Sequence, residues 1–431
     1  MERVLMITYY WPPSGGPGVQ RPLKFVKYLP AQGFQPLVIT VDPERAYYPL
    51  LDPGLEKDIP PEALVFRTPT FEPFALYEKL TGKNKMPKPG FAGEGKPGRL
   101  ETLARFIRGN LFVPDPRRGW NRFLIRQALE VIGKYQPLAL ITSSPPHSTQ
   151  LAGQQLKKRT GLPWIADLRD PWTDIYYYKE FRHLPWIRKK DAAYERRVLE
   201  EADAVLVVSE ALKRLFLTKS PRITPEKIHV IPNGYDPVDF PEKPCRGKNE
   251  QFTLVYTGTL SSDYPVEALA KAFQILSNRH SIQDIILQVV GKASPQLQET
   301  FIKCNLGERV KISPYVPHSE AISRMQCADA LLLIIPKVSN NEGILTGKLF
   351  EYLATGVPIA GLGPVEGDAA AILSETGAGR MIAYDDAEAL AEWLLEIYQH
   401  RSETHVPSEA AVKYSRPALT HRLAQIIQQL R

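Results

Sequence analysis

Short apolar runs alternate with helical patterns along most of this chain, and that alternation limits the folds it can adopt. The predicted strands are Val4–Tyr10, Leu37–Val41, Leu138–Thr142, Trp164–Asp167, Ala204–Val208, Ile228–Ile231, Thr253–Thr257, Ile285–Val290, Val310–Ile312, Ala330–Ile335, Val357–Ala360 and Gly379–Ile382. Helical patterns such as Ser148–Lys158 and Ala387–Gln399 separate most of them. Strands that alternate with helices predict parallel sheets covered by helices on both faces.

The alternation occurs twice, on either side of a stretch from Tyr235 to Gln251 that is rich in proline and charge. A chain of 431 residues is also too long for one ordinary hydrophobic core. We therefore predict an α/β protein with two doubly wound domains. In such domains ligands bind at the carboxyl ends of the strands.

Composition sets the broad class of protein. Hydrophobic residues make up 43% and charged residues 23% of the chain, which is typical of a globular protein. No apolar run approaches the roughly 18 residues that cross a bilayer. The three cysteines, Cys245, Cys304 and Cys327, show neither a disulfide framework nor a metal-binding spacing, so we expect a cytoplasmic protein.

The net charge is +7, and part of the excess lies in Arg105–Arg126, where arginines mix with aromatic and aliphatic residues. This segment is consistent with contact to an anionic membrane surface, and equally with an ordinary solvated loop and helix. The Gly-, Pro- and Lys-rich stretch within Phe71–Arg99 does not fit the alternation and is predicted to be an excursion from the first domain. The sequence has neither a helix-turn-helix pattern nor a zinc-binding spacing, so a nucleic-acid partner is not expected.

The most informative segment is Ile334–Ile359, in which an apolar run is followed by a polar loop and a helical pattern. Lys348 falls in the first turn of that helix, and Glu351 shares its face one turn later. A helix N-terminus with an added lysine suits a diphosphate, and a carboxylate one turn on suits a pair of sugar hydroxyls. Glu342, in the preceding loop, is a second candidate for sugar hydroxyls and is also a candidate catalytic acid. The alternative is that these residues are solvated surface charges.

Further candidates follow other predicted strands. Gly15 and Gly16 lie in the turn after the first strand and permit close approach of the backbone to a ligand. Arg21, near the start of the next helix, is a further candidate for donor binding. The loop has neither the lysine of a Walker motif nor a full dinucleotide fingerprint. Gly258 similarly ends the strand TLVYTG. Each glycine is alternatively a structural turn.

His147 and Asp170 are the candidate catalytic residues of the first half. His147 follows the strand that contains Leu138–Thr142, and Asp170 ends the charged sequence IADLRD. Charges that follow an apolar strand must be paired or face a cleft, because burial of an unpaired charge is costly. Asp170 is alternatively part of a structural ion-pair cluster, and His147 an ordinary residue at a helix start.

Taken together, the sequences PPSGGPGVQR, SSPPH, IADLRDPW, VIPNGYDPVDF, YTGTL and KLFEYLATGVPI resemble, in this order, the retaining glycosyltransferases of family four (group 1). The resemblance covers nearly the whole chain and is strongest to bacterial members that build cell-surface polysaccharides. It implies the glycosyltransferase B fold of two facing Rossmann-like domains. It also implies a last helix that returns to the first domain. The implied domains are 1–238 with 413–431, on the acceptor side, and 239–412, on the donor side.

The resemblance also implies roles for single residues. Glu351 would bind the donor's ribose hydroxyls, Lys348 would contact the diphosphate, and Gly258 would approach it with its backbone. The loop of Gly15 and Gly16 would face the sugar and the leaving group. The chain departs from the family pattern because eight residues separate Glu342 from Glu351, one more than in many members. It also lacks the basic pair that often follows the first strand of the second domain.

The resulting prediction is a cytoplasmic or peripheral membrane glycosyltransferase. It would transfer a hexose-type sugar from a nucleoside-diphosphate sugar, with retention, to a sugar, lipid-linked or other acceptor. No metal or other cofactor is expected. The alternatives are an epimerase or hydrolase of the same fold, and a non-catalytic partner subunit that keeps the nucleotide-sugar site.

Overall fold

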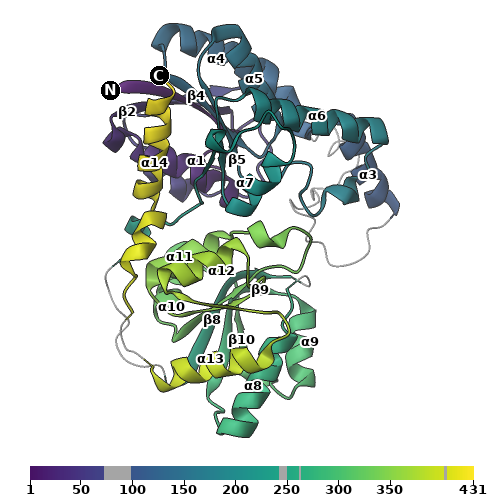
Figure 1. Ribbon diagram of the computed structural model, residues 1–431, viewed down its shortest axis with the longest axis vertical. Helices are drawn as coiled ribbons and strands as arrows, with labels where there is room; N and C mark the ends of the chain where they lie inside the picture. Colours follow the sequence, from purple (N-terminus) through teal and green to yellow (C-terminus); the bar gives the residue numbers. More distant parts are fainter. Residues whose placement is uncertain (72–98, 242–249, 262–263, 402–404) are drawn as a thin grey trace. The chain divides into compact units, whose positions relative to one another are not determined.

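The computed structural model describes residues 1–71, 99–241, 250–261, 264–401 and 405–431, and it contains two compact units (Figure 1). The first unit consists of Met1–Pro232 with Arg416–Arg431, and the second of Asn233–Ser415. These divisions lie a few residues from the domain boundaries expected at 238 and 413.

The first unit is built on a parallel sheet of seven strands in the order β3-β2-β1-β4-β5-β6-β7. Its strands are β1 (Glu2–Ile7), β2 (Phe34–Val41), β3 (Leu64–Thr68), β4 (Ala139–Ser144), β5 (Trp164–Leu168), β6 (Ala204–Val207) and β7 (Ile228–Val230). The sequence pattern missed β3, a short edge strand that lies between prolines.

Helices cover both faces of this sheet. The helices of this unit are α1 (Pro17–Tyr28), α3 (Arg99–Leu111), α4 (Asn121–Tyr135), α5 (Ser148–Thr160), α6 (Pro185–Glu201), α7 (Glu210–Leu217) and α14 (Arg416–Gln429), with short 3-10 helices that include η3 (Pro116–Trp120) and η4 (Tyr178–Phe181), and α3 lies beside η4 rather than on the sheet. Side chains of α4 to α7 form one hydrophobic core against the sheet, and those of α1 and α14 form the other. Alternate strand residues point to opposite faces, which supplies both cores.

The last helix belongs to the first unit, as the resemblance implied. Leu419, Leu423 and Ile427 of α14 are buried with Val19 and Leu23 of α1. Figure 1 shows the yellow helix α14 beside α1. The apolar side chains of α14 therefore complete the core of a unit whose other elements end at Pro232.

The second unit is a parallel sheet of six strands in the order β10-β9-β8-β11-β12-β13. Its strands are β8 (Phe252–Leu260), β9 (Ile285–Ala293), β10 (Val310–Ser313), β11 (Ala330–Ile334), β12 (Ile359–Leu362) and β13 (Gly379–Ile382). Its helices are α8 (Glu267–His280), α9 (Pro295–Lys303), α10 (His318–Gln326), α11 (Gly347–Thr355), α12 (Asp368–Thr376) and α13 (Ala387–Gln399). Two cores again lie on opposite faces of the sheet. The predicted α/β fold of two doubly wound parallel sheets is confirmed.

The structure tests two of the sequence interpretations only in part. Most of the Phe71–Arg99 excursion lies outside the described residues. Arg105–Arg126 does not form one continuous surface, because Trp120 is fully buried and donates a 2.7 Å hydrogen bond to Thr68 Oγ1, and Arg117 is only 6% exposed. The exposed residues of this segment are therefore divided between α3 and isolated positions such as Arg118, Arg122 and Arg126.

The cysteines depart from the expectation. Cys304 is a free thiol, but Cys327 takes part in a disulfide bond, so the expected lack of disulfides is not met. Among the described helices, none is long and apolar enough to cross a membrane.

Candidate active site

Gly258 and Lys348 lie together at the carboxyl end of β8. Gly258 has a φ of +107°, and a Cβ atom on it would lie 2.8 Å from Lys348 Cε. Both the backbone conformation and the lysine stem therefore require glycine at this position. The structure thus brings together two of the residues predicted to hold the diphosphate.

Aromatic side chains surround the Lys348 amine. Its Nζ donates a 2.8 Å hydrogen bond to Tyr256 Oη and lies 4.6 Å from the centre of the Tyr256 ring and 6.0 Å from that of Tyr264. Burial lowers the pKa of Lys348 to about 8, and the charge of Glu351 opposes this only in part. An anion at this place would favour the charged ammonium form and raise that pKa again.

Glu351 lies one turn along α11 from Lys348, in contact with a residue of α10. Its Oε1 lies 3.1 Å from His318 Nε2, and the side chains of Glu351 and His318 are 33% and 52% exposed. The next residue, Tyr352, is buried, and its hydroxyl accepts a 3.0 Å hydrogen bond from the backbone N–H of Thr257. This bond joins the middle of α11 to β8 near its carboxyl end, so Glu351, Lys348 and Gly258 have defined relative positions.

Glu342 lies in the same unit but is not joined to this cluster. It belongs to the 3-10 helix Asn341–Gly343 and is exposed. Among the described residues, no hydrogen bond or ion pair connects Glu342 with Lys348 or Glu351. Its predicted role as a catalytic acid stays a prediction.

In the first unit, the predicted glycine loop lies between β1 and α1. Gly16 has a φ of +86° at the N-cap of α1, and the space where its Cβ would be is open. Gly15 donates a 2.8 Å hydrogen bond from its backbone N–H to Leu50 O. The loop therefore has the backbone conformation that the glycines allow, and a contact with the donor stays a prediction.

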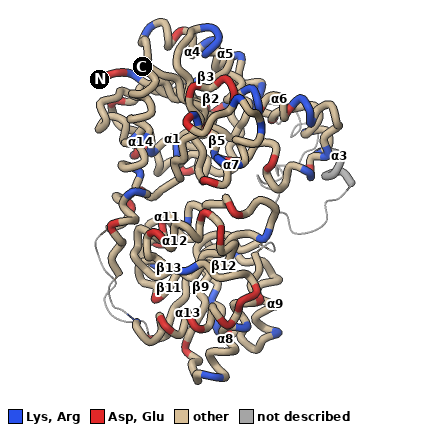
Figure 2. Tube along the Cα trace, viewed as in Figure 1, with Lys and Arg blue, Asp and Glu red and all other residues tan. Residues whose placement is uncertain are grey.

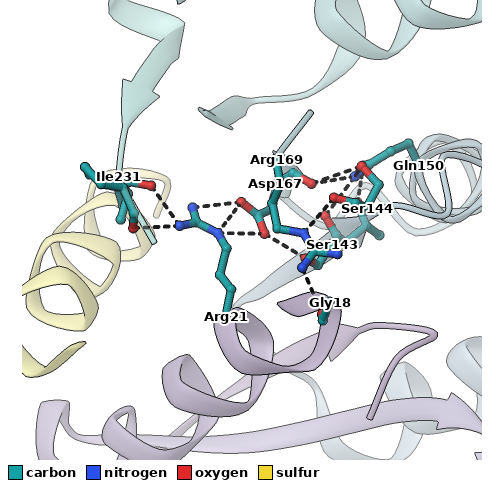
Figure 3. A network of polar contacts seen from close by, with 10 residues as sticks. Gly18, Arg21, Ser143, Ser144, Gln150, Asp167, Arg169 and Ile231 are labelled. Atoms are coloured by element: carbon teal, nitrogen blue, oxygen red, sulfur yellow. Dashed lines mark hydrogen bonds and ion pairs between the residues drawn. The ribbon is translucent and has the colours of Figure 1, made fainter. Parts of the chain in front are cut away.

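Arg21 is engaged in the interior of the protein (Figure 3). It is 1% exposed, and its Nε donates hydrogen bonds of 2.9 and 3.1 Å to the two carboxylate oxygens of Asp167. Its Nη1 donates to the carbonyl oxygens of Ile231 and Pro232 at 2.8 and 2.9 Å. These contacts favour a structural role for Arg21 over the predicted contact with the donor.

Arg169 fixes the turns that carry the remaining candidates. Its guanidinium donates to the carbonyl oxygens of Ser144, Gly18 and Pro145 at 2.9, 2.8 and 3.2 Å. The turns after β1, β4 and β5 therefore share one cation (Figure 3). The ion-pair interpretation of the IADLRD sequence holds for Asp167, but its cation is Arg21 and not Arg169. Arg169 donates to carbonyl oxygens instead, and Asp170 has no hydrogen bond or ion pair with the described residues.

His147 and Asp170 line the same cavity, of about 270 Å³, within the first unit. Burial and the charge of Arg169 lower the pKa of His147 to about 3, so its ring is a neutral imidazole. Burial also raises the pKa of Asp170, although Arg169 opposes this shift. The structure therefore brings together the two catalytic candidates of the first unit, as a neutral histidine and a desolvated carboxyl group.

The position of the His147 ring depends on residues that the sequence analysis did not single out. The ring stacks on Trp172 at 4.6 Å with an interplanar angle of 9°. Trp172 Nε1 donates a 2.9 Å hydrogen bond to Asp191, which also accepts from Tyr178 Oη at 2.8 Å. Burial raises the pKa of Asp191 to about 6. The ionised carboxylate, which accepts both hydrogen bonds, therefore predominates above about this pH.

Some of these residues were detectable in the sequence. Tyr256 precedes Gly258 by two positions, so strand alternation places both on one face of β8. His318 and Asp191 had no such signal, because each meets its partner through tertiary packing. No cluster of three or more His, Cys, Asp and Glu side chains in the described part of the chain could hold a metal ion.

The architecture is that of the glycosyltransferase B fold, which is also seen in solved structures. The sucrose-phosphate synthase of Thermosynechococcus elongatus superposes with a TM-score of 0.58 at 15% identity, over 100% of this chain and 99% of that one. HepE of Anabaena, in complex with UDP, superposes with a TM-score of 0.58 at 14% identity, over 100% of each chain. At these identities the likeness shows the fold alone.

The family follows from the sequence models. Residues 15–234, about half of the chain, match the glycosyl transferase 4-like domain, and residues 251–400 match the glycosyl transferases group 1. The chain therefore belongs to the glycosyltransferase family that these two models describe, with a 4-like domain followed by a group 1 domain. The MMP alpha-(1->4)-mannosyltransferase of Mycolicibacterium hassiacum is 24% identical over 271 residues. The chain spans about 60% of the length of this curated relative, and the match covers 60% of the chain.

The Arg21–Asp167 pair yields a prediction about stability. Arg21→Met leaves the Asp167 carboxylate buried without its cation, so we expect the free energy of unfolding to fall by about 3–5 kcal/mol. Urea unfolding of the purified variants measures this change. The control is Arg126→Met, because Arg126 is 86% exposed and its loss should change stability by less than about 0.5 kcal/mol. Equal stability of the two variants would contradict the structural role of Arg21.

Proposed function

We propose that this glycosyltransferase moves a hexose-type sugar from a nucleoside-diphosphate sugar to an acceptor, with retention of the anomeric configuration. Family membership supports transfer of a sugar rather than epimerisation, hydrolysis or a non-catalytic role. The observation that carries the donor assignment is the cluster of Gly258, Lys348 and Glu351, held between β8 and α11. Complexes of the neighbour HepE with UDP and with UDP-glucose support a nucleotide sugar as donor.

In this proposal, the second unit is the donor domain. The diphosphate lies against Gly258 and the first turn of α11, where backbone N–H groups, the helix dipole and Lys348 supply positive charge. Glu351 accepts hydrogen bonds from the ribose hydroxyls. Because charge develops on the leaving diphosphate, Lys348 stabilises the transition state more than the ground state. This arrangement supplies the required charge from the protein itself, and we propose that transfer is metal-independent.

The first unit is the acceptor domain in this proposal. Its cavity carries Asp170 and His147, and aromatic rings such as Trp172 and Tyr177 line it. A desolvated carboxyl group suits a sugar hydroxyl as a hydrogen-bond partner, and aromatic rings suit the apolar face of a sugar ring. The resemblance to bacterial enzymes of surface polysaccharides supports an acceptor in polysaccharide or glycolipid synthesis at the cytoplasmic side of the membrane.

Glu351 tests the donor site by substitution. Glu351→Ala should weaken binding of the nucleoside diphosphate by roughly ten- to a hundredfold, since loss of a charge-assisted hydrogen bond costs about 1.5–3 kcal/mol. The ligand is chosen from UDP, GDP and ADP by thermal stabilisation of the wild type. Calorimetric titration then gives the dissociation constants.

A matched control is available for this test. Glu388→Ala removes another exposed carboxylate of the second unit, one that pairs with Arg279 on the far helices α13 and α8. Its affinity should equal that of the wild type. If folded Glu351→Ala binds the nucleotide as the wild type does, the proposed donor site is incorrect.

The pKa of Lys348 predicts how nucleotide binding depends on pH. In the free protein this pKa is about 8, and a bound diphosphate raises it. Below pH 7 the amine is already charged and binding needs no proton. As the pH rises through 8, binding must take up a proton, so the affinity falls by up to about tenfold per pH unit.

Calorimetry between pH 7.5 and 9.5, in buffers with different ionisation enthalpies, measures this uptake, because the nucleotide phosphates ionise near pH 6 and are already charged. Lys348→Arg keeps a charge that does not titrate in this range and should take up no proton. Identical uptake by the two proteins would show that Lys348 does not face the diphosphate.

A further inference from the structure

An unusual number of large apolar side chains is exposed where α3 meets the start of α6. On α3, Phe106, Ile107 and Leu111 are 36%, 42% and 73% exposed. At the start of α6, Leu184 and Trp186 are 37% and 61% exposed. Soluble surfaces carry scattered apolar residues, but an exposed cluster usually marks an interaction site.

The two helices are held together at this place by specific contacts. Asn110 of α3 accepts a 2.7 Å hydrogen bond from the backbone N–H of Leu184 and donates to the carbonyl oxygen of Arg182 at 3.3 Å. Gly109 packs so closely on η4 that a Cβ atom there would lie 2.8 Å from Phe181 Cβ. The five apolar side chains therefore belong to one surface, which we call the α3–α6 patch.

Cations border the apolar side chains of this patch. Arg182 and the consecutive Arg188, Lys189 and Lys190 of α6 are exposed. The nearby acidic residue Glu180 already pairs with Arg105, at 2.6 Å. Figure 2 shows several blue Lys and Arg segments along α6 and on α3. The patch thus combines apolar residues, one of them tryptophan, with a net positive rim.

We propose that the α3–α6 patch docks on an anionic lipid bilayer, with Leu111 and Trp186 in the headgroup region and the α6 cations over the lipid charges. A tryptophan and aliphatic residues bordered by lysine and arginine are the pattern of interfacial membrane contact. A protein partner with an apolar surface would not need four cations at the rim. Charge complementarity therefore selects the lipid surface.

The position of α3 connects this patch to the cavity of the first unit. Arg108, Gly109 and Phe112 line the cavity, whereas Ile107 and Leu111 of the same helix are exposed. A single helix thus separates the proposed bilayer surface from the cavity. Docking here would place the cavity beside the membrane, and this step rests on the proposed function, in which the acceptor of the first unit can be carried by a lipid.

The test is sedimentation of the full chain with vesicles of phosphatidylglycerol and phosphatidylcholine. The wild type should bind anionic vesicles at low salt, bind neutral vesicles much more weakly, and be released as salt rises. Each cation near an anionic surface is worth about fivefold in affinity, so Lys189→Gln with Lys190→Gln should weaken binding about 25-fold. Leu111→Ser with Trp186→Ser should also weaken it, without greater salt sensitivity.

The control variant changes one apolar and one cationic residue that are exposed on another helix. Ile302 and Lys303 of α9 are exposed, with Ile302 at 63%, and Ile302→Ser with Lys303→Gln should leave vesicle binding unchanged. Nucleotide binding should be normal in all variants, which separates this proposal from that of the donor site. Failure of the wild type to bind anionic vesicles at low salt, or equal losses in the patch and control variants, would overturn the proposal.

Discussion

The first unit depends on a buried ion pair between Arg21 of α1 and Asp167 of β5. Both side chains are 1% exposed, and their partners include the carbonyl oxygens of Ile231 and Pro232 and the hydroxyl of Ser143. Desolvation of two such charges is costly, and the hydrogen bonds to these carbonyl and hydroxyl groups offset part of that cost. The pair therefore fixes one helix, two strands and the end of the first 232 residues in a single arrangement.

The Arg21–Asp167 pair also affects the neighbouring turns after β1 and β4. Because Arg21 neutralises Asp167, the adjacent Arg169 is left to bind the carbonyl oxygens of the turns after β1 and β4. His147 and Asp170, which follow β4 and β5, line one cavity. In the second unit, tyrosines hold the candidate site residues. Tyr256 accepts a hydrogen bond from Lys348, and Tyr352 joins α11 to β8. In both units buried side chains thus hold the candidate site residues in place.

The sequence predicted the fold well because apolar strands and helical patterns are local signals. Both sheets and the return of the last helix agreed with expectation, whereas β3 was missed because prolines border its five residues. The site was predictable only in part. Lys348 and Glu351 were visible as neighbours on one helix, but the position of Arg21 beside a glycine loop did not reveal that its partner lies 146 residues away.

Partners made by tertiary packing had no sequence signal. His318 reaches Glu351 from another helix, and Asp191 supports His147 only through Trp172. The same limit applies to the Arg105–Arg126 segment, whose composition favours a surface although Arg117 and Trp120 point inward. Composition indicates that a segment is amphipathic, but only the packed structure shows which of its side chains remain exposed.

We propose that the second unit holds the nucleoside diphosphate between Gly258 and the start of α11. Hydrogen–deuterium exchange with saturating nucleotide tests it most directly, because backbone amides that bind phosphate exchange more slowly. We expect slower exchange at the amides of Gly258 and Thr259 and in the first turn of α11, at Lys348 and Leu349. Nucleotide binding without any change in exchange at the start of α11 would contradict it.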